Sequence, residues 1–167
     1  DLKGGMNVTM EIALSDMVRN LANNSTDANF NAAIKNAEAA MATGESDFIS
    51  VFGREFEKIS PNSKLSPLFA TKENSANLKI DASNQDVLNF LRKSADGAID
   101  LSFNILRTRI DKFGVTSPNI QKQQGTNRIL IELPGVTDPD RVRKLLQGSA
   151  KLEFWETYEN TEIFSLL

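Results

Sequence analysis

A long apolar stripe between Ser83 and Gly114 constrains the fold of this 167-residue chain more than any other feature. Its apolar residues recur at steps of three and four, and the phase is unbroken across Gly97. This spacing predicts one helix of about thirty residues and about 45 Å, with Gly114 as the left-handed residue that ends it. The stripe consists of Val87, Leu88, Leu91, Ala95, Ile99, Phe103, Leu106, Ile110 and Phe113.

The segment before this helix contains a predicted strand and several predicted helices. Residues 6–12 alternate between apolar and polar side chains, which indicates a strand with one buried face. Helical spacing follows three times, from caps predicted at Ser15, at Thr26 or Asp27, and near Ser46. These patterns predict a helical region between the first strand and the long helix.

Phenylalanine is concentrated in that helical region, where half of the chain's ten lie between residues 30 and 69. Phenylalanines at helical spacing either form a core or line a peptide-binding groove. A short alternating run at Leu78 and Ile80 follows them and is interpreted as a strand.

The part after the long helix is predicted to begin with a β-hairpin. Ile120 lies in a polar strand candidate, residues 125–127 supply turn residues, and residues 128–133 place Ile129, Ile131 and Leu133 on one face. Pro134-Gly135 ends the hairpin.

A last helix and a last strand are predicted after the hairpin. Asp138 caps the helix, Pro139 occupies its first position and Gly148 ends it. Residues 151–158 alternate again. The whole order predicts an α+β fold, a ferredoxin-like β-α-β-β-α-β arrangement with a helical region inserted between the first strand and the long helix.

Composition removes several function classes. The chain has no histidine and no cysteine, which excludes mechanisms that need imidazole or thiolate. No half of the chain is basic, and the local run Arg141, Arg143 and Lys144 is interpreted as a solvated helix face rather than a nucleic-acid surface.

Catalytic, metal and membrane sites are not predicted. Nothing in the sequence places the carboxylate pairs Asp138 with Asp140 and Glu153 with Glu156 in a cleft. No stretch approaches the roughly 20 apolar residues of a membrane helix. We therefore expect a non-enzymatic domain without cofactor or metal.

An ordered set of motifs resembles the first periplasmic domain of the SecD family. The N-terminal pentapeptide Asp1-Leu-Lys-Gly-Gly5 is weak by itself, but the later pieces occur in the family's order and spacing. They are residues 105–115, Pro118, residues 121–124, residues 128–136 and Ala150-Lys-Leu-Glu-Phe154.

This resemblance implies a non-catalytic part of the bacterial protein-export machinery. SecD assists translocation of unfolded preproteins driven by the proton-motive force, with the Sec translocon (SecYEG) and SecF as partners. The domain would lie on the periplasmic side of the inner membrane, anchored through transmembrane helices outside this chain. It would form a rigid base for a mobile head that contacts the substrate.

The implied domain boundaries follow the predicted elements. They are residues 1–13 for the first strand, 14–82 for the inserted helical region, 83–158 for the base, and 159–167 for the start of a linker to the head. Without the resemblance, a free-standing ferredoxin-like module for a small ligand or RNA remains the alternative, and an enzyme is the third.

The motif residues are expected to be structural. Gly4 and Gly5 would permit close packing and an unusual backbone conformation. Arg107 and Arg109 cannot share one helix face, and Arg107 would lie along apolar surface or pair with Glu132. The other motif positions are Asp1, Gly114, Pro134, Gly135, Glu153 and Phe154. Substrate, if bound, would add a strand to a sheet edge.

Overall fold

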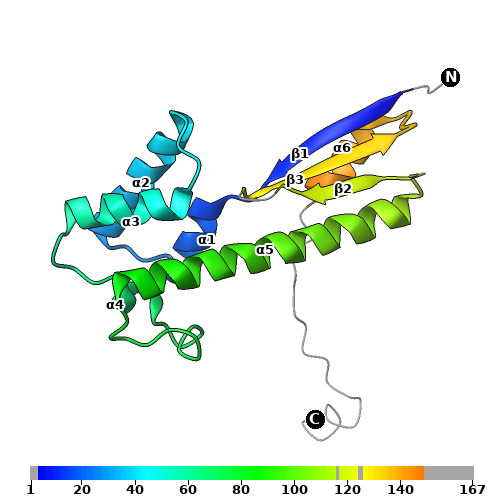
Figure 1. Cartoon of the computed structure of the whole chain (residues 1–167). Helices are drawn as coiled ribbons and strands as arrows, with labels where there is room; N and C mark the ends of the chain where they lie inside the picture. The colour runs from blue at the N-terminus through cyan, green and yellow to red at the C-terminus, as the bar shows by residue number, and fades with distance from the viewer. Residues whose placement is uncertain (1–3, 116, 124–125, 149–167) are drawn as a thin grey trace, which may run out of the picture. The chain divides into compact units, whose positions relative to one another are not determined.

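A computed structural model describes residues 4–115, 117–123 and 126–148 (Figure 1). These residues form an α+β fold that divides into two units, Asp1–Thr137 and Asp138–Leu167. The predicted strand at residues 151–158 and the linker at 159–167 lie outside the described residues. The elements are β1 (Gly5–Glu11), α1 (Leu14–Leu21), α2 (Ala28–Ala42), α3 (Phe48–Ile59), α4 (Ser66–Phe69), α5 (Asn84–Phe113), β2 (Asn119–Lys122), β3 (Arg128–Pro134) and α6 (Pro139–Gln147).

The long helix α5 forms as one continuous element of 30 residues. At its start the Ser83 hydroxyl accepts a hydrogen bond from the Asp86 backbone N–H, and the Asp86 carboxylate accepts one from the Ser83 backbone N–H, each at 3.1 Å. Hydrogen bonds from Ser83, the side-chain bond first, hold the pKa of Asp86 below its ordinary value. Gly114, at φ 77°, ends the helix in the left-handed conformation, as predicted.

The first half of α5 closes a hydrophobic core with α1 to α4, and we call this assembly the helical module. Phe30, Phe52 and Phe69 are fully buried at its centre, and their ring centroids lie 5.8 to 6.5 Å apart with edge-to-face geometry. Val87, Leu88, Leu91 and Ala95 are the α5 residues in this core. The phenylalanine stripe is therefore a core and not a peptide-binding groove.

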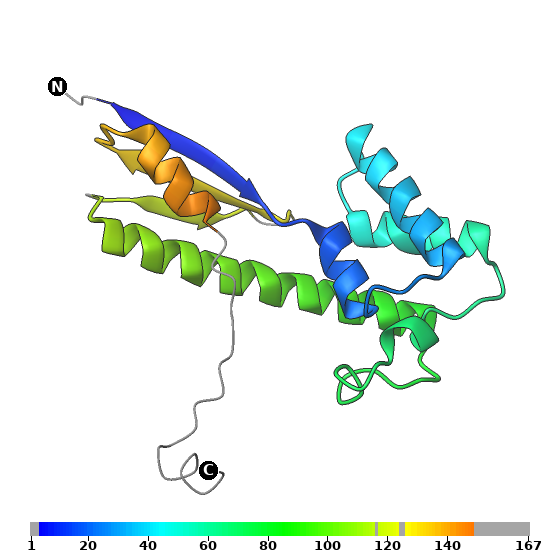
Figure 2. The ribbon, with the colours of Figure 1, turned by 180° about the vertical axis from the view of Figure 1, so that it is seen from behind.

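The second half of α5 lies beside a three-stranded antiparallel sheet of order β1-β3-β2 (Figures 1 and 2). The central strand β3 buries Ile129, Ile131 and Leu133, which share one face. Register pairs these residues with Met10, Val8 and Met6 of β1, so the apolar side predicted for residues 6–12 joins the same face. Leu106 and Ile110 are the buried residues of this half of α5.

The middle of α5 belongs to neither core. Residues 96–105 contain no buried side chain, and Leu101 and Ile105 are 62% and 42% exposed. Gly97 lies in this stretch, and a methyl group placed on it would meet no atom within 4 Å. The helix therefore connects two separately packed regions through a stretch of ten residues, nearly three turns.

Two sets of polar contacts hold the chain where β1 ends and where α3 begins. The Asn127 backbone carbonyl accepts a hydrogen bond from Ile12 N–H, and its side-chain amide donates to the Ile12 carbonyl, which fixes the exit of β1. Arg92 of α5 donates to the Ser50 hydroxyl at 2.7 Å and lies 4.0 Å from Asp47. Backbone pairing and side-chain contacts thus hold the start of α1 and of α3.

The second unit contains α6, which begins and ends as predicted. The Asp138 side chain accepts a hydrogen bond from the Arg141 backbone N–H at 3.0 Å, Pro139 follows, and Gly148 is the C-cap. Val142 and Leu146 are its buried residues.

Two local predictions need correction. Leu78 and Ile80 form no strand: the Asn74 carbonyl accepts hydrogen bonds from the N–H groups of Asn77 and Leu78, which makes a turn. Leu78 alone enters the core, and two alternating residues are too few to distinguish a strand from a loop with one buried anchor.

The predicted cap at Ser15 is also displaced, because α1 begins after Ala13, which makes no side-chain capping bond. Helix α3 begins after Asp47, next to the predicted position near Ser46, and the Asp47 carboxylate accepts from Ser50 N–H at 3.1 Å. For α2, Asp27 is the cap and accepts from Phe30 N–H.

Two helical glycines provide a matched test of this packing. Gly97→Ala should raise the free energy of unfolding by about 1 kcal/mol, because alanine is the better helix former and space is free. Gly53→Ala should lower it by about 1 kcal/mol, because its methyl group would lie 2.6 Å from Leu88 Cδ1 in the module core and overpacking outweighs propensity. Urea denaturation of both variants measures the two changes. Equal changes in the free energy of unfolding would contradict the location of Gly97 in a stretch without buried side chains.

Candidate functional site

The glycine-containing motifs from the two ends of the described chain meet at one end of the sheet. Gly5 is the register partner of Pro134, and the Gly135 N–H donates to the Gly4 carbonyl at 3.1 Å. We call Gly4, Gly5, Pro134, Gly135 and Val136 the glycine clasp. The antiparallel pairing of β1 with β3 is what brings these residues together across about 130 positions of sequence.

Gly4 and Gly135 adopt backbone conformations that glycine tolerates best, at φ 79° and 72°. A methyl group on Gly4 would lie 2.9 Å from the Val136 carbonyl oxygen, a clash with backbone. At Gly5 the nearest atom would be the Leu133 carbonyl oxygen at 3.7 Å, an ordinary contact. The expected close approach and unusual backbone therefore occur at Gly4, whereas Gly5 has neither.

The two motif arginines lie apart from the clasp on α5. Arg107 is exposed and Arg109 is half-buried. Among the residues that the structure describes, Arg107 makes no ion pair with Glu132, which instead accepts a hydrogen bond from the Asn119 side-chain amide at 2.8 Å. The expected partner of Arg107 is thus already occupied by β2, the neighbouring strand.

The remaining motif residues are distributed as follows. Gly114 ends α5. Asp1, Glu153 and Phe154 lie outside the described residues. The structure therefore brings together four of the motif positions, Gly4, Gly5, Pro134 and Gly135, and leaves the arginines and Gly114 on the long helix.

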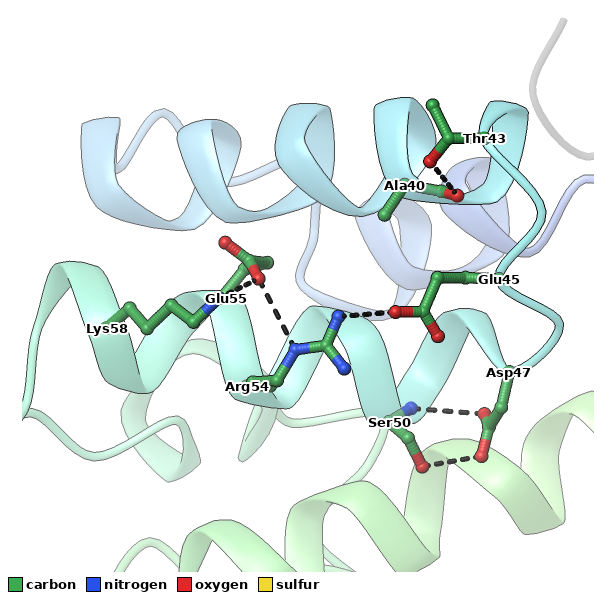
Figure 3. Close-up of polar contacts among 8 residues, drawn as sticks. All are labelled: Ala40, Thr43, Glu45, Asp47, Ser50, Arg54, Glu55 and Lys58. Carbon is green, nitrogen blue, oxygen red and sulfur yellow. Dashed lines mark hydrogen bonds and ion pairs between the residues drawn. The ribbon is translucent and has the colours of Figure 1, made fainter.

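Charged groups of the helical module are engaged in local contacts on its surface (Figure 3). Arg54 pairs with Glu45 at 3.0 Å and with Glu55 at 3.5 Å, and Lys58 pairs with Glu55 at 2.7 Å. The hydrogen bond from Lys58 lowers the pKa of Glu55. These contacts stabilise the ionised carboxylate, which is the opposite of what a general acid near neutral pH requires.

The pKa of Asp47 is also lowered, but by a different set of causes. Burial, the largest influence, acts to raise its pKa, but hydrogen bonds from the Ser50 side chain and backbone and the charge of Arg92 together lower it. The carboxyl groups predicted as a candidate pair in α6 are likewise structural, since Asp138 caps the helix and Asp140 pairs with Arg143 at 2.8 Å.

Among the residues that the structure describes, no three carboxylate side chains lie together where they could hold a metal ion. Within the same residues, no helix combines the length and the apolarity needed to cross a membrane.

One cavity among the described residues was not anticipated from the sequence. A groove of about 890 Å³ lies between the loop at residues 77–83 and the first turns of α5. Beside it, Ile80 is 64% exposed, although the sequence pattern had grouped it with Leu78 in a strand. The groove's lining residues all lie between Asn77 and Ser94, in the loop and in the helix that directly follows it.

Comparison with known proteins identifies the class of protein. Residues 99–159 match the family described as "Protein translocase subunit SecDF, P1 domain, N-terminal". This match covers the second half of α5, both hairpin strands and α6. The matched segment thus resembles a domain of a protein-translocase subunit.

Curated relatives agree over a larger part of the chain. The protein translocase subunit SecD of Rhodothermus marinus is 43% identical over 154 residues, 92% of this chain and 24% of that protein. That of Calditerrivibrio nitroreducens is 31% identical over 172 residues, 96% of this chain and 32% of that protein. That of Escherichia coli K12 is 41% identical over 64 residues, 38% of this chain. The chain belongs to the SecD family and contains the N-terminal part of a P1 domain.

The chain spans about a quarter to a third of the length of the relatives that it matches nearly throughout. No solved structure matches this chain significantly.

The two adjacent glycines of the clasp provide a matched pair for testing it. Gly4→Ala should lower the free energy of unfolding by about 1 to 2 kcal/mol, because alanine is strained at positive φ and would meet the Val136 carbonyl. Gly5→Ala should change it by no more than about 0.5 kcal/mol. Chemical denaturation followed by circular dichroism measures both. Equal effects of the two substitutions would show that the clasp geometry does not distinguish them.

Proposed function

We propose that this chain is the base of the first periplasmic domain of a SecD-type subunit, acting without catalysis in preprotein translocation. The observation that carries the proposal is the glycine clasp, in which both glycine-containing family motifs meet on one sheet. The family match and the SecD relatives support the same assignment. The base holds its neighbours in place and has no reaction to perform.

The finer fold belongs to this proposal. The order β1-β3-β2 with antiparallel pairs is the order of the first three strands in a ferredoxin-like β-α-β-β-α-β fold. One edge of β1 is without a partner strand among the described residues. We infer that the base, predicted as residues 83–158, and the strand at residues 1–13 make one ferredoxin-like domain.

The mechanical role follows from this arrangement. The base lies on the periplasmic side of the inner membrane and is anchored by transmembrane helices of the full-length protein. Residues 159–167 begin a linker to a head that contacts the unfolded preprotein. The proton-motive force acts on groups elsewhere in the SecD and SecF parts, next to the SecYEG translocon, and the base transmits the resulting movement to the head.

Export by a chimeric subunit tests the proposal. This chain would replace the matching segment in the SecD of Rhodothermus marinus, and processing of a pulse-labelled preprotein would be followed in cells that depend on the chimera. We expect export near the rate of the unmodified subunit, and slower export when Gly4 and Gly5 are both replaced by alanine, because the clasp then fails to close. An unchanged rate in the double variant, with the protein present at normal amounts, would contradict a role for the clasp.

A further inference from the structure

The first half of α5 is packed into the helical module as far as Ala95. Leu91 and Ala95 are buried in the module core. Beside them, the Arg92 guanidinium donates a hydrogen bond to the Ser50 hydroxyl of α3 at 2.7 Å. Because a close-packed core resists deformation, this half of α5 must move together with the module.

The second half of α5 is attached to the sheet from Asp100 onward. Lys122 of β2 donates to the Asp100 carboxylate at 2.6 Å, and its Nζ lies 5.6 Å from the centroid of the Phe103 ring. Further along the helix, Leu106 and Ile110 are buried beside the sheet. This half of α5 therefore follows the sheet in any movement.

Residues 96–99 of α5 lie between these two sets of contacts. None of them is buried, and they include Gly97. Glycine has a wide range of backbone conformations and a low helix propensity, and a methyl group placed on Gly97 would meet no atom within 4 Å. Bending the helix at this point would therefore distort neither core.

Within the part of the chain that the structure describes, the only other passage between the two regions is residues 12–13, which link β1 to α1. The Ile12 N–H donates to the Asn127 carbonyl at 3.0 Å, and the Asn127 side-chain amide donates to the Ile12 carbonyl. Ile12 is therefore held by the sheet region. Ala13 precedes α1 and makes no side-chain capping bond, so the link turns after Ile12.

Packing between the elements follows the same division. Helices α1, α3 and α4 pack against α5, and α2 packs against α3. Strands β2 and β3 pack against one another and against α5, and β1 pairs with β3. Among the described elements, no helix from α1 to α4 packs closely against a strand. The two regions are thus connected mainly through α5 and the link at residues 12–13.

Both passages border one cavity of about 290 Å³. Leu14 lines it directly after the link, and Asp96 and Ile99 line it on α5. Phe48 of the module and Asn127 of the sheet region also line it. Because both passages lie beside the same cavity, a rotation about the line that joins them would change the size of this cavity and leave each core intact.

We propose that Gly97 and the link at residues 12–13 form a hinge, about which the helical module turns relative to the sheet. Turning bends α5 at residues 96–99 and opens or closes the cavity beside them. Alanine would fit at position 97 and would favour the helix, so glycine there suits a hinge better than a rigid connection. The hinge is a property of the chain itself and does not depend on the proposed function.

Double electron–electron resonance between spin labels measures this movement in the full 167-residue chain, which has no cysteine of its own. Lys35→Cys with Thr9→Cys spans the hinge. Lys35→Cys with Glu57→Cys lies within the module, and Thr9→Cys with Lys112→Cys lies within the sheet region; all four residues are exposed. We expect a broader distance distribution for the spanning pair than for either of the other pairs.

Gly97→Ala tests where the chain bends. Because alanine is the better helix former, this substitution should lower the population of bent helix by about fivefold and narrow the distribution of the spanning pair. The two pairs within regions should not change. The control is Asn104→Ala, which raises helix propensity at an exposed position in the half of α5 attached to the sheet and should leave the spanning pair unchanged.

Either of two results would overturn the hinge. One is a distribution for the spanning pair as narrow as those of the pairs within regions. The other is a spanning distribution that Gly97→Ala changes no more than Asn104→Ala does. Export by the chimera is measured separately and does not require the module to turn, so a rigid α5 would reject the hinge and retain the proposed function.

Discussion

The continuity of α5 is the constraint on which the rest of the described fold depends. Its first half supplies Val87, Leu88 and Leu91 to the helical module, and its second half supplies Leu106 and Ile110 beside the sheet. Neither region can bury its apolar face without this helix. The capping box at Ser83 and the left-handed Gly114 set the two ends, so the length of α5 fixes the separation of the two regions.

This arrangement explains why the helical module and the family motifs are separable. The P1-domain match begins at residue 99, beyond Ala95, the last residue of α5 in the module core. The clasp and the sheet likewise make no use of the aromatic core formed by Phe30, Phe52 and Phe69. A module with its own core is attached to the sheet region through α5 and through the segment between β1 and α1, where Asn127 contacts Ile12.

Sequence patterns predicted the elements whose periodicity is long or whose caps are distinctive. Helix α5, strand β3 and helix α6 fall in this group, because Gly114, Pro139 and Asp138 have strong local preferences. The two-residue alternation of Leu78 and Ile80 was misleading, since one is buried and the other is exposed in a turn. Periodicity did not reveal the clasp, because it arises from segments far apart in the sequence that meet only after folding.

Native-state amide hydrogen exchange in increasing urea tests most directly whether α5 serves two separate cores. The account predicts two opening free energies along this one helix: one for residues 87–95, shared with α2 and α3, and a different one for residues 106–110, shared with β3. Amides of residues 96–105, where no side chain is fully buried, should exchange at the lowest urea concentrations. A single opening free energy for all amides of α5, α3 and β3 would contradict it.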